Sequence, residues 1–284
     1  MTIVDAHQHY WQPDRGDYAW LAQAPAALRR PFLPADLRSQ REAAGVQFSV
    51  LVQAAPSEDE TRYLFELARR DTAVLGVIGW VDLEAADVCP RIQALISDGG
   101  GLLRALRPMA QDIADPDWLA RPALDRAFDC MIDHGLAFDA LVTTAQLPAL
   151  CRRLHRHPQL RAVLDHAGKP PMAPGDSSQW NRWIDELAQR PQLHCKLSGL
   201  LTLLDPGVHE QAIEPRVEDL FDRFGATRLM WGSDWPVLTI HADYGHWLRL
   251  AQTLTDRYAP GCQAEVFGAN ATRFYALDIA TALS

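Results

Sequence analysis

The run Val74-Leu75-Gly76-Val77-Ile78-Gly79-Trp80 is apolar at almost every position, and it points to the class of fold. A strand with one face in water alternates apolar and polar residues, whereas a strand buried on both faces is a continuous apolar run. Strands of the second kind occur in parallel sheets that helices cover on both sides. The run therefore predicts a parallel strand within an α/β fold.

Similar short apolar runs recur along the chain and alternate with amphipathic stretches. The expected strands are residues 3–9, 47–53, 74–82, 102–107, 136–142, 161–166, 193–199 and 228–234. Ser57-Glu58-Asp59-Glu60 has the form of a capping box that opens a helix. Eight strand–helix units within about 230 residues predict a (β/α)8 TIM barrel. A doubly wound open sheet is the alternative, but no Gly-X-Gly-X-X-Gly motif follows the first expected strand.

Composition bounds the class of protein. The 284 residues contain no linker-like or low-complexity run, so we expect one domain over 1–284. A net charge of −9 argues against nucleic-acid binding, which needs a basic surface. No apolar run approaches the ~20 residues of a membrane span, and the N-terminus lacks a signal-peptide pattern. Five cysteines without a Cys-X-X-Cys pair predict unbridged thiols in a cytoplasmic protein. The sequence leaves open whether the protein is a monomer or a homo-oligomer.

The connection after the first expected strand is unusually long. Residues 10–34 are rich in Trp, Pro and Arg and precede the first helical pattern. Long loops in compact domains are usually functional, often as lids. We therefore expect this loop to cover part of a site.

A histidine pair ends the first expected strand, in Ile3-Val4-Asp5-Ala6-His7-Gln8-His9. Alternation along a strand puts residues i and i+2 on one face, so His7 and His9 can converge. Asp234 ends the last expected strand, in Leu229-Met230-Trp231-Gly232-Ser233-Asp234. Two imidazoles and a carboxylate can hold a divalent metal or orient a water molecule. An isolated His-X-His pair is more often a chance feature of a turn, but the acidic strand end downstream favours a functional site.

In barrels of this kind the chemistry lies at the C-terminal ends of the strands. Both lysines of the chain fall at these strand ends, which supports a functional role for the residues there. The polar and aromatic residues at these ends are His7, His9, Gln53, Trp80, Asp82, Arg104, Arg107, Asp139, Asp165, His166, Lys169, Lys196, Ser198 and Asp234. Asp82, Asp139 and Asp165 are expected to cap the helices that follow them rather than to take part in catalysis.

Together these motifs resemble the amidohydrolase superfamily over nearly the whole chain. The resemblance rests on Asp5-Ala6-His7-Gln8-His9, Asp165-His166, Trp231-Gly232-Ser233-Asp234-Trp235-Pro236, Glu265-Val266-Phe267-Gly268-Ala269-Asn270-Ala271 and Phe274-Tyr275. Further stretches are similar to the sugar-lactonase branch: His7-Gln8-His9-Tyr10-Trp11, Asp17-Tyr18-Ala19-Trp20-Leu21, Leu164-Asp165-His166-Ala167-Gly168-Lys169-Pro170 and Lys196-Leu197-Ser198-Gly199-Leu200. The resemblance implies an enzyme that opens an aldonolactone such as L-fuconolactone to the aldonic acid.

The same resemblance bears on metal content. Many members of the superfamily hold two metals bridged by a carboxylated lysine at the end of strand 4, but residues 102–107 contain no lysine. We therefore expect at most one divalent ion, Zn²⁺, on His7, His9 and Asp234. The resemblance also implies that relatives in this branch hydrolyse lactones without a metal, so we expect the ion to be dispensable for activity.

The chemistry of lactone opening assigns roles to the remaining candidates. A strained ring ester needs a positioned water, a base and a partner for the oxyanion. Asp234 is assigned as the base, and His166 helps His7 and His9 to orient the water and polarise the carbonyl. The expected substrate contacts are Gln53, Arg104, Lys169 and Lys196 as donors, with Trp11 and Trp235 as aromatic plates and Trp20 and Trp80 as further candidates.

Other activities fit parts of the pattern. A metal-dependent decarboxylase of the same superfamily would need a tightly held ion and a carboxylate clamp, for which Arg104, Arg107 and the lysines are available. A hydrolase of a dicarboxylate lactone would use the same strand ends. A sugar-binding barrel without catalysis would explain the tryptophans, but it gives no reason for a base among histidines.

Overall fold

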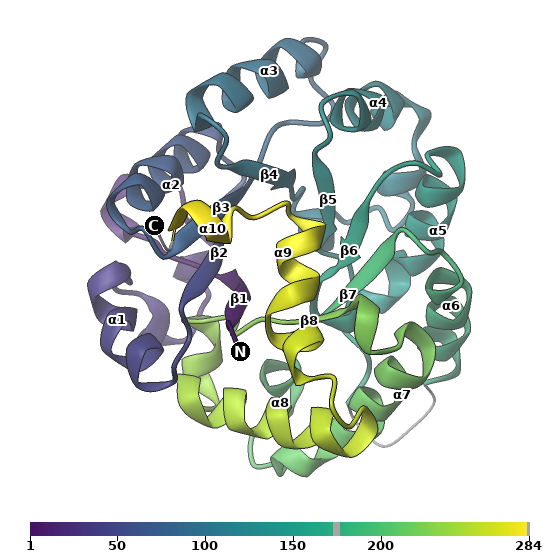
Figure 1. Ribbon diagram of the computed structural model, residues 1–284. Coiled ribbons are helices and arrows are strands. Elements are labelled where there is room, and N and C mark those ends of the chain that lie inside the picture. The colour runs from purple at the N-terminus through teal and green to yellow at the C-terminus, as the bar shows by residue number, and fades with distance from the viewer. Residues whose placement is uncertain (173–176, 283–284) are drawn as a thin grey trace.

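The eight strands follow one another around the sheet in the order of the sequence, and every neighbouring pair is parallel. The computed structural model describes residues 1–172 and 177–282. The strands are β1 (Val4–Gln8), β2 (Phe48–Val52), β3 (Val74–Gly79), β4 (Leu103–Leu106), β5 (Ala137–Ala140), β6 (Ala162–Leu164), β7 (Leu193–Leu197) and β8 (Leu229–Trp231). The predicted (β/α)8 barrel is confirmed (Figure 1). Each strand is shorter than expected and loses residues at one or both of its ends.

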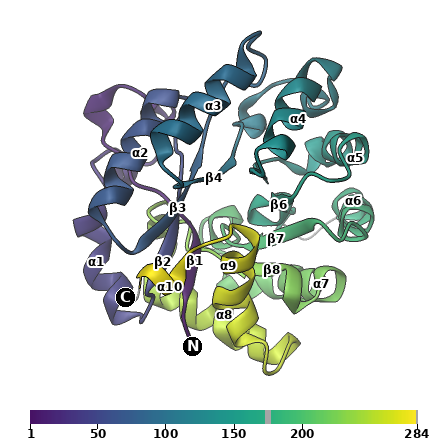
Figure 2. The same ribbon diagram turned by 45° about the horizontal axis from the view of Figure 1, so that its top comes forward.

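Helices surround the sheet, as both views show (Figures 1 and 2). They are α1 (Pro34–Ala43), α2 (Glu58–Arg70), α3 (Val88–Gly99), α4 (Asp125–Asp133), α5 (Leu147–Arg156), α6 (Ser178–Ala188), α7 (Glu214–Phe224), α8 (Tyr244–Tyr258), α9 (Asn270–Phe274) and α10 (Ile279–Ala282). Ser57 caps α2 by accepting from the backbone N–H of Glu60 at 3.1 Å. The capping box is not reciprocal, because the Glu60 carboxylate accepts from the backbone N–H of Ala54 instead. Within the described ranges, no helix has the length and apolar character that crossing a membrane would require.

Two apolar clusters stabilise the barrel. The larger lies between the sheet and the outer helices. The smaller fills the inside with one or two residues from most strands, and the segment around α9 closes it from below with Ala271, Phe274, Tyr275 and Leu277. In Figure 1, α9 lies across the middle of the barrel. All five cysteines are free thiols, as expected.

The seam between β1 and β8 closes the barrel. The backbone N–H of Asp234 donates to the carbonyl of His7 at 2.8 Å, and that of His9 donates to the carbonyl of Trp235 at 2.7 Å. The buried Asp5 carboxylate accepts from the backbone N–H of Ser233 at 2.8 Å and from the Tyr244 hydroxyl at 3.0 Å. This seam places the histidine pair beside Asp234, although more than 200 residues separate them in sequence.

An irregularity in β1 aims the histidines. Val4 and Ala6 belong to the inner cluster, so strict alternation would turn His7 outward. The pairing of β1 with β2 shifts register between Asp5 and Gln8, which brings His7 inside as well. Such irregularities re-aim side chains near active sites. His7 and His9 do share a face, as the sequence predicted.

The long first loop is held at both ends. Trp11 and Phe32 form an antiparallel bridge with backbone hydrogen bonds of 3.0 and 2.9 Å. Three short 3₁₀ turns lie between them, at Pro13–Arg15, Ala19–Ala22 and Ala26–Leu28. The indole N–H of Trp11 donates to the carbonyls of Leu28 and Arg30 inside the loop. The loop is therefore folded on itself, with its tryptophans turned toward the barrel.

The closing seam predicts the effect of one added methyl group. A Cβ at Gly232 would lie 2.6 Å from the Cβ of His7, between two packed strands. Gly232→Ala should therefore lower the free energy of unfolding by about 1–3 kcal/mol, the usual cost of overpacking, as measured by urea denaturation.

Gly245→Ala is the matched control. A Cβ there would lie 3.1 Å from the end of the flexible Arg249 side chain and 3.6 Å from Asp243 Oδ1, an ordinary contact, and the residue lies in α8. Alanine in a helix is favoured over glycine by up to about 1 kcal/mol, so this variant should be as stable as the original chain or more so. Equal stability of the two variants would contradict the tight seam.

Candidate active site

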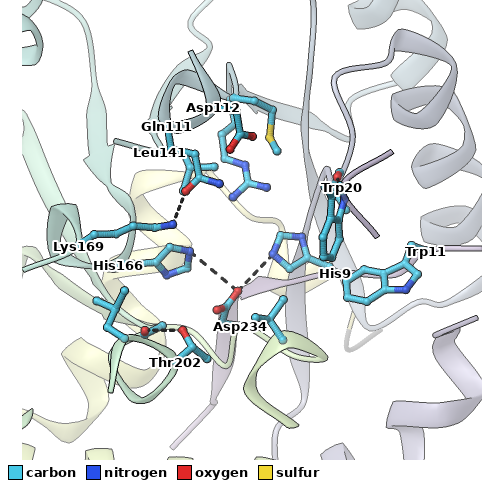
Figure 3. A pocket seen from close by; sticks show the side chains of 16 residues that line it. His9, Trp11, Trp20, Gln111, Asp112, Leu141, His166, Lys169, Thr202 and Asp234 are labelled. Atoms are coloured by element: carbon cyan, nitrogen blue, oxygen red, sulfur yellow. Dashed lines mark hydrogen bonds and ion pairs between the residues drawn. The ribbon is translucent and has the colours of Figure 1, made fainter. Parts of the chain in front are cut away.

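A cavity of about 300 Å³ opens at the C-terminal ends of the strands (Figure 3). Its walls come from the first loop, from the ends of several strands and from the turns that follow β4 and β7. The lining residues are His9, Trp11, Trp20, Ala54, Arg107, Met109, Gln111, Asp112, Leu141, His166, Lys169, Gly199, Thr202, Leu203, Asp234 and Val237. The volume suits one small molecule.

Three histidines surround the carboxylate of Asp234 at the base of this cavity. Asp234 Oδ1 lies 3.4 Å from His9 Nε2, 3.7 Å from His7 Nε2 and 3.9 Å from His166 Nε2. Figure 3 shows His9 and His166 pointing at the carboxylate from opposite sides. Asp234 and His166 both have left-handed backbone conformations, with φ of 57° and 51°. Such conformations are costly for non-glycine residues and are found most often at functional sites.

The protonation states follow from burial and from these contacts. Burial alone would raise the pKa of Asp234, but its histidine neighbours, His166 above all, hold that pKa below its ordinary value. Burial lowers the pKa of His166 to about 4 despite the nearby carboxylates. Burial and the adjacent Lys196 ammonium lower the pKa of His7 well below its ordinary value. At neutral pH the site therefore contains the ionised carboxylate of Asp234 beside the neutral rings of His7 and His166.

A buried ion cluster lies beneath the histidines. Lys196 Nζ is 2.5 Å from Asp139 Oδ2, 3.0 Å from Asp165 Oδ1 and 3.1 Å from His7 Nδ1. Burial raises the pKa of Asp139 to about 6, while Lys196 and His7 overcome burial and hold the pKa of Asp165 well below its ordinary value. Asp165 is therefore ionised at neutral pH, and the adjacent Lys196 ammonium favours the ionised form of Asp139 as well. The Tyr275 hydroxyl donates to Asp139 at 2.9 Å and ties the cluster to the C-terminal segment.

Arg107 connects this cluster to the cavity. Its Nη1 lies 3.4 Å from Asp165 Oδ2, and its Nη2 donates to the backbone carbonyl and the side-chain oxygen of Gln53. The Gln53 amide donates in return to the carbonyl of Arg107 at 2.8 Å. The guanidinium is thus held in one position at the cavity wall.

The upper wall combines polar groups with aromatic rings. The Lys169 ammonium donates to Gln111 Oε1, as Figure 3 shows, and Asp112 lies on the same side. Trp20 is held by a 2.8 Å hydrogen bond from its indole N–H to the carbonyl of Ala54, and it meets Trp11 edge to face. Hydrogen-bonding groups on one wall therefore face apolar rings on another.

The structure brings only part of the expected site together. The expected residues that line the cavity are His9, Asp234, His166, Lys169, Trp11 and Trp20, and His7 lies directly behind them. Gln53, Arg104, Lys196, Trp235 and Trp80 are not in its lining.

Each absence from the lining has a physical reason. Gln53 and Lys196 are fully buried and bonded to Arg107 and to the ion cluster. The side chain of Arg104 packs beside Gly76 and Leu277, away from the cavity. Trp235 is buried against Tyr10 and Phe32, and Trp80 lines a separate hollow. A role of these side chains in direct substrate contact is therefore not supported.

The helix-capping roles expected for the strand-end aspartates are also corrected. Asp139 and Asp165 point into the barrel and pair with Lys196. Asp82 accepts from the backbone N–H of Glu84 at 3.0 Å in a turn that precedes α3 by several residues.

Some cavity residues were not predicted. Gln111 and Asp112 follow β4 in a short 3₁₀ turn, and Thr202 and Leu203 belong to another after β7. These turns lie beyond the strand ends and have no periodic pattern, so the sequence did not identify their residues. Of the two arginines at the end of β4, Arg107 reaches the cavity, in place of the predicted Arg104.

The donor set suits a single metal ion. The candidate ligand atoms of His7, His9 and Asp234 all lie within 4.8 Å of one another. Their separations are 3.1 Å between the two Nε2 atoms, and 3.4 and 3.7 Å from these to Asp234 Oδ1. Tetrahedral Zn²⁺ with bonds of about 2.0–2.1 Å spaces its ligands roughly 3.3 Å apart. The group could therefore bind a metal with little rearrangement.

Comparisons with known proteins agree with this geometry. The sequence profile of the family described as Amidohydrolase matches residues 4–277. An L-fucono-1,5-lactonase of Burkholderia ambifaria is 46% identical over 97% of this chain and 96% of its own length. An L-fucono-1,5-lactonase of Burkholderia multivorans is 34% identical over 96% of each chain. The crystal structure of an amidohydrolase from Burkholderia multivorans with bound Zn superposes with a TM-score of 0.91, at 34% identity over 98% of this chain and 100% of that one.

The protonation state of His166 is open to direct measurement. Because burial lowers its pKa to about 4, the ring should still be neutral at about pH 5.5, where an exposed histidine is largely protonated. NMR of ¹⁵N-histidine-labelled protein, with the His166 signals assigned from a His166→Asn variant, measures this. Protonation of His166 between about pH 6 and 7 would contradict the site described above.

Proposed function

This chain belongs to the amidohydrolase family, and we propose that it hydrolyses L-fucono-1,5-lactone, or an aldonolactone of the same shape, to the aldonic acid. Full-length similarity to two L-fucono-1,5-lactonases supports the substrate. The observation that carries the proposal is the ionised Asp234 carboxylate, which faces a small cavity between His9 and His166. A base in that position has a use in hydrolysis, whereas a binding protein would not need it.

The charges around the cavity favour a neutral substrate. The charged residues in its lining are two cations, Arg107 and Lys169, and two anions, Asp112 and Asp234. Both cations already have partners, Arg107 in Asp165 and Lys169 in Gln111. A dicarboxylate lactone or the carboxylate of a decarboxylase substrate would enter a cavity with no net positive charge to receive it. A polyhydroxylated lactone needs only hydrogen bonds.

The reaction begins with a water molecule at Asp234. The carboxylate accepts a proton from the water as the oxygen attacks the lactone carbonyl carbon, and a tetrahedral intermediate forms. The ring C–O bond then breaks, and Asp234 returns the proton to the departing ring oxygen. General acid–base catalysis of this kind typically contributes ~10²–10⁴-fold in rate.

His166 is the donor for the developing oxyanion. Its Nδ1 lies 2.9 Å from the Ser198 hydroxyl. With Ser198 donating to Nδ1, the neutral ring carries its proton on Nε2, the atom that faces Asp234 and the cavity. An oxyanion donor is worth ~10²–10³-fold in turnover, so base and donor together are sufficient for an activated ester.

His7, His9 and Asp234 would be the ligands of a bound Zn²⁺, which would supply Lewis-acid polarisation of the carbonyl. The ion is dispensable in our proposal, because a strained lactone is already electrophilic and the residues named above provide the base and the oxyanion donor.

The role of the base predicts the effect of a conservative change. Asp234→Asn keeps the shape of the side chain and removes the proton acceptor, so turnover should fall by roughly 10³-fold. Steady-state kinetics of acid release measure it, with circular dichroism to verify the fold. Asp112→Asn makes the same change on another cavity carboxylate and should act mainly by raising KM. If folded Asp234→Asn keeps a large part of the original turnover, the base lies elsewhere.

The balance of charge and hydrogen-bonding groups predicts substrate preference. A site built to bind hydroxyl groups discriminates against analogues that leave its donors unpaired. Values of kcat/KM should be highest for L-fucono- and L-galactono-lactones, lower for an unsubstituted lactone and lowest for a dicarboxylate lactone. A faster reaction with either of the last two would refute the sugar assignment while leaving a lactonase in place.

A further inference from the structure

The position of Lys196 determines which nitrogen of His7 carries a proton. An ammonium group has three N–H donors and no acceptor. Lys196 Nζ faces Asp139 Oδ2, Asp165 Oδ1 and His7 Nδ1, at 2.5, 3.0 and 3.1 Å. The contacts with Asp139 and His7 have hydrogen-bond geometry, whereas the contact with Asp165 is an ion pair. The contact with His7 is a hydrogen bond only if Nδ1 accepts. An accepting Nδ1 carries no proton, so the ring proton of His7 is then on Nε2.

His9 continues this chain of hydrogen bonds in the same direction. His9 Nδ1 lies 2.8 Å from the carbonyl oxygen of Val52, which only accepts, so this nitrogen donates. His9 Nε2 lies 3.1 Å from His7 Nε2 and is the atom that can accept the proton of His7. The hydrogen bonds run in one direction, from Lys196 through His7 and His9 to Val52, and each donor meets an acceptor.

Binding of a metal requires the opposite arrangement at His7. Zn²⁺ at the three-residue site needs the lone pair of His7 Nε2, so the proton must move to Nδ1. There it would face the Lys196 ammonium, another donor, at 3.1 Å. The acceptor that the cluster offers to an Nδ1 proton is Asp165 Oδ1, at 3.4 Å. A buried cation beside a ligand also repels a divalent ion.

We propose that Lys196 is a positioning residue that holds His7 as the Nε2-protonated tautomer and so keeps the Zn²⁺ affinity of the His7–His9–Asp234 group low, while Asp165 favours the metal-binding tautomer. This inference concerns the chain's own hydrogen bonds and does not rest on the proposed substrate. It assigns to Lys196 a role in place of the substrate contact that the sequence suggested. The same lysine that completes the buried ion cluster thereby tunes the metal site.

The charge-balanced variant Lys196→Met/Asp139→Asn tests this proposal. It removes one buried cation together with one buried anion and leaves Asp165 beside His7 and Arg107. Asp139→Asn alone is the matched control, because it disturbs the same cluster but keeps the Lys196 donor on His7. Zinc affinity is measured on metal-free protein by competition with a chromophoric chelator, and the His7 tautomer by ¹⁵N shifts of labelled histidine.

In the original chain, His7 should be protonated on Nε2. The double variant should show the Nδ1-protonated ring and bind Zn²⁺ about 10–100-fold more tightly, the usual range for partners of metal ligands. Asp139→Asn should keep the original tautomer. Unchanged or weaker zinc affinity in the folded double variant would overturn the proposal, as would an Nδ1 proton on His7 in the original chain.

Asp165→Asn provides a second test of the proposal if the double variant does not fold. This variant keeps Lys196 and loses the charged acceptor for an Nδ1 proton, so zinc affinity should fall and the Nε2-protonated tautomer should remain. Tighter zinc binding by Asp165→Asn would contradict the proposal. The tautomer in the original chain requires no substitution at the cluster and is informative in either case.

Discussion

The ammonium group of Lys196, buried between the carboxylates of Asp139 and Asp165, is the interaction on which the rest of the site depends. Its strand, β7, places it inside the barrel with no exposed surface. Asp165 also lies beside His7 and Arg107, so the cluster positions one histidine behind the base and one cation in the cavity wall. Removing one partner of such a buried group typically costs about 3–5 kcal/mol, because it leaves an uncompensated charge.

The barrel supplies this arrangement through its closure. The seam between β1 and β8 joins the histidine pair to Asp234, and the inner apolar cluster with α9 fills the other end. Tyr275, just beyond α9, reaches Asp139 with its hydroxyl group, so the C-terminal segment supports the site as well as the core. Above the cluster, two cations and two carboxylates line one small cavity. The interior is therefore rich in charge, whereas the cavity is balanced for a neutral ligand.

The sequence predicted the eight strands, the barrel and the group formed by His7, His9, His166 and Asp234. These predictions succeeded because apolar runs identify buried strands, and because strand ends in such a barrel meet at one edge. The rule that functional residues lie at the C-terminal ends of strands could not show which of Lys169 and Lys196 lines the cavity. Lys196 is still within β7 and turns into the barrel, whereas Lys169 follows a turn after β6 and reaches the cavity. Arg104, within β4, and Arg107, just beyond it, differ in the same way. Gln111 and Asp112 were missed because a short turn carries no periodic signal.

The most direct test of the account is a crystal structure of the Asp234→Asn variant with L-fucono-1,5-lactone bound. We expect the lactone in the cavity with its carbonyl carbon facing the substituted side chain at position 234 and its carbonyl oxygen toward His166 Nε2. Its hydroxyl groups should lie toward Lys169, Gln111 and Asp112. A lactone bound in the reverse orientation, with hydroxyl groups at position 234 and its carbonyl at Lys169, would contradict the assignment of Asp234 as the base.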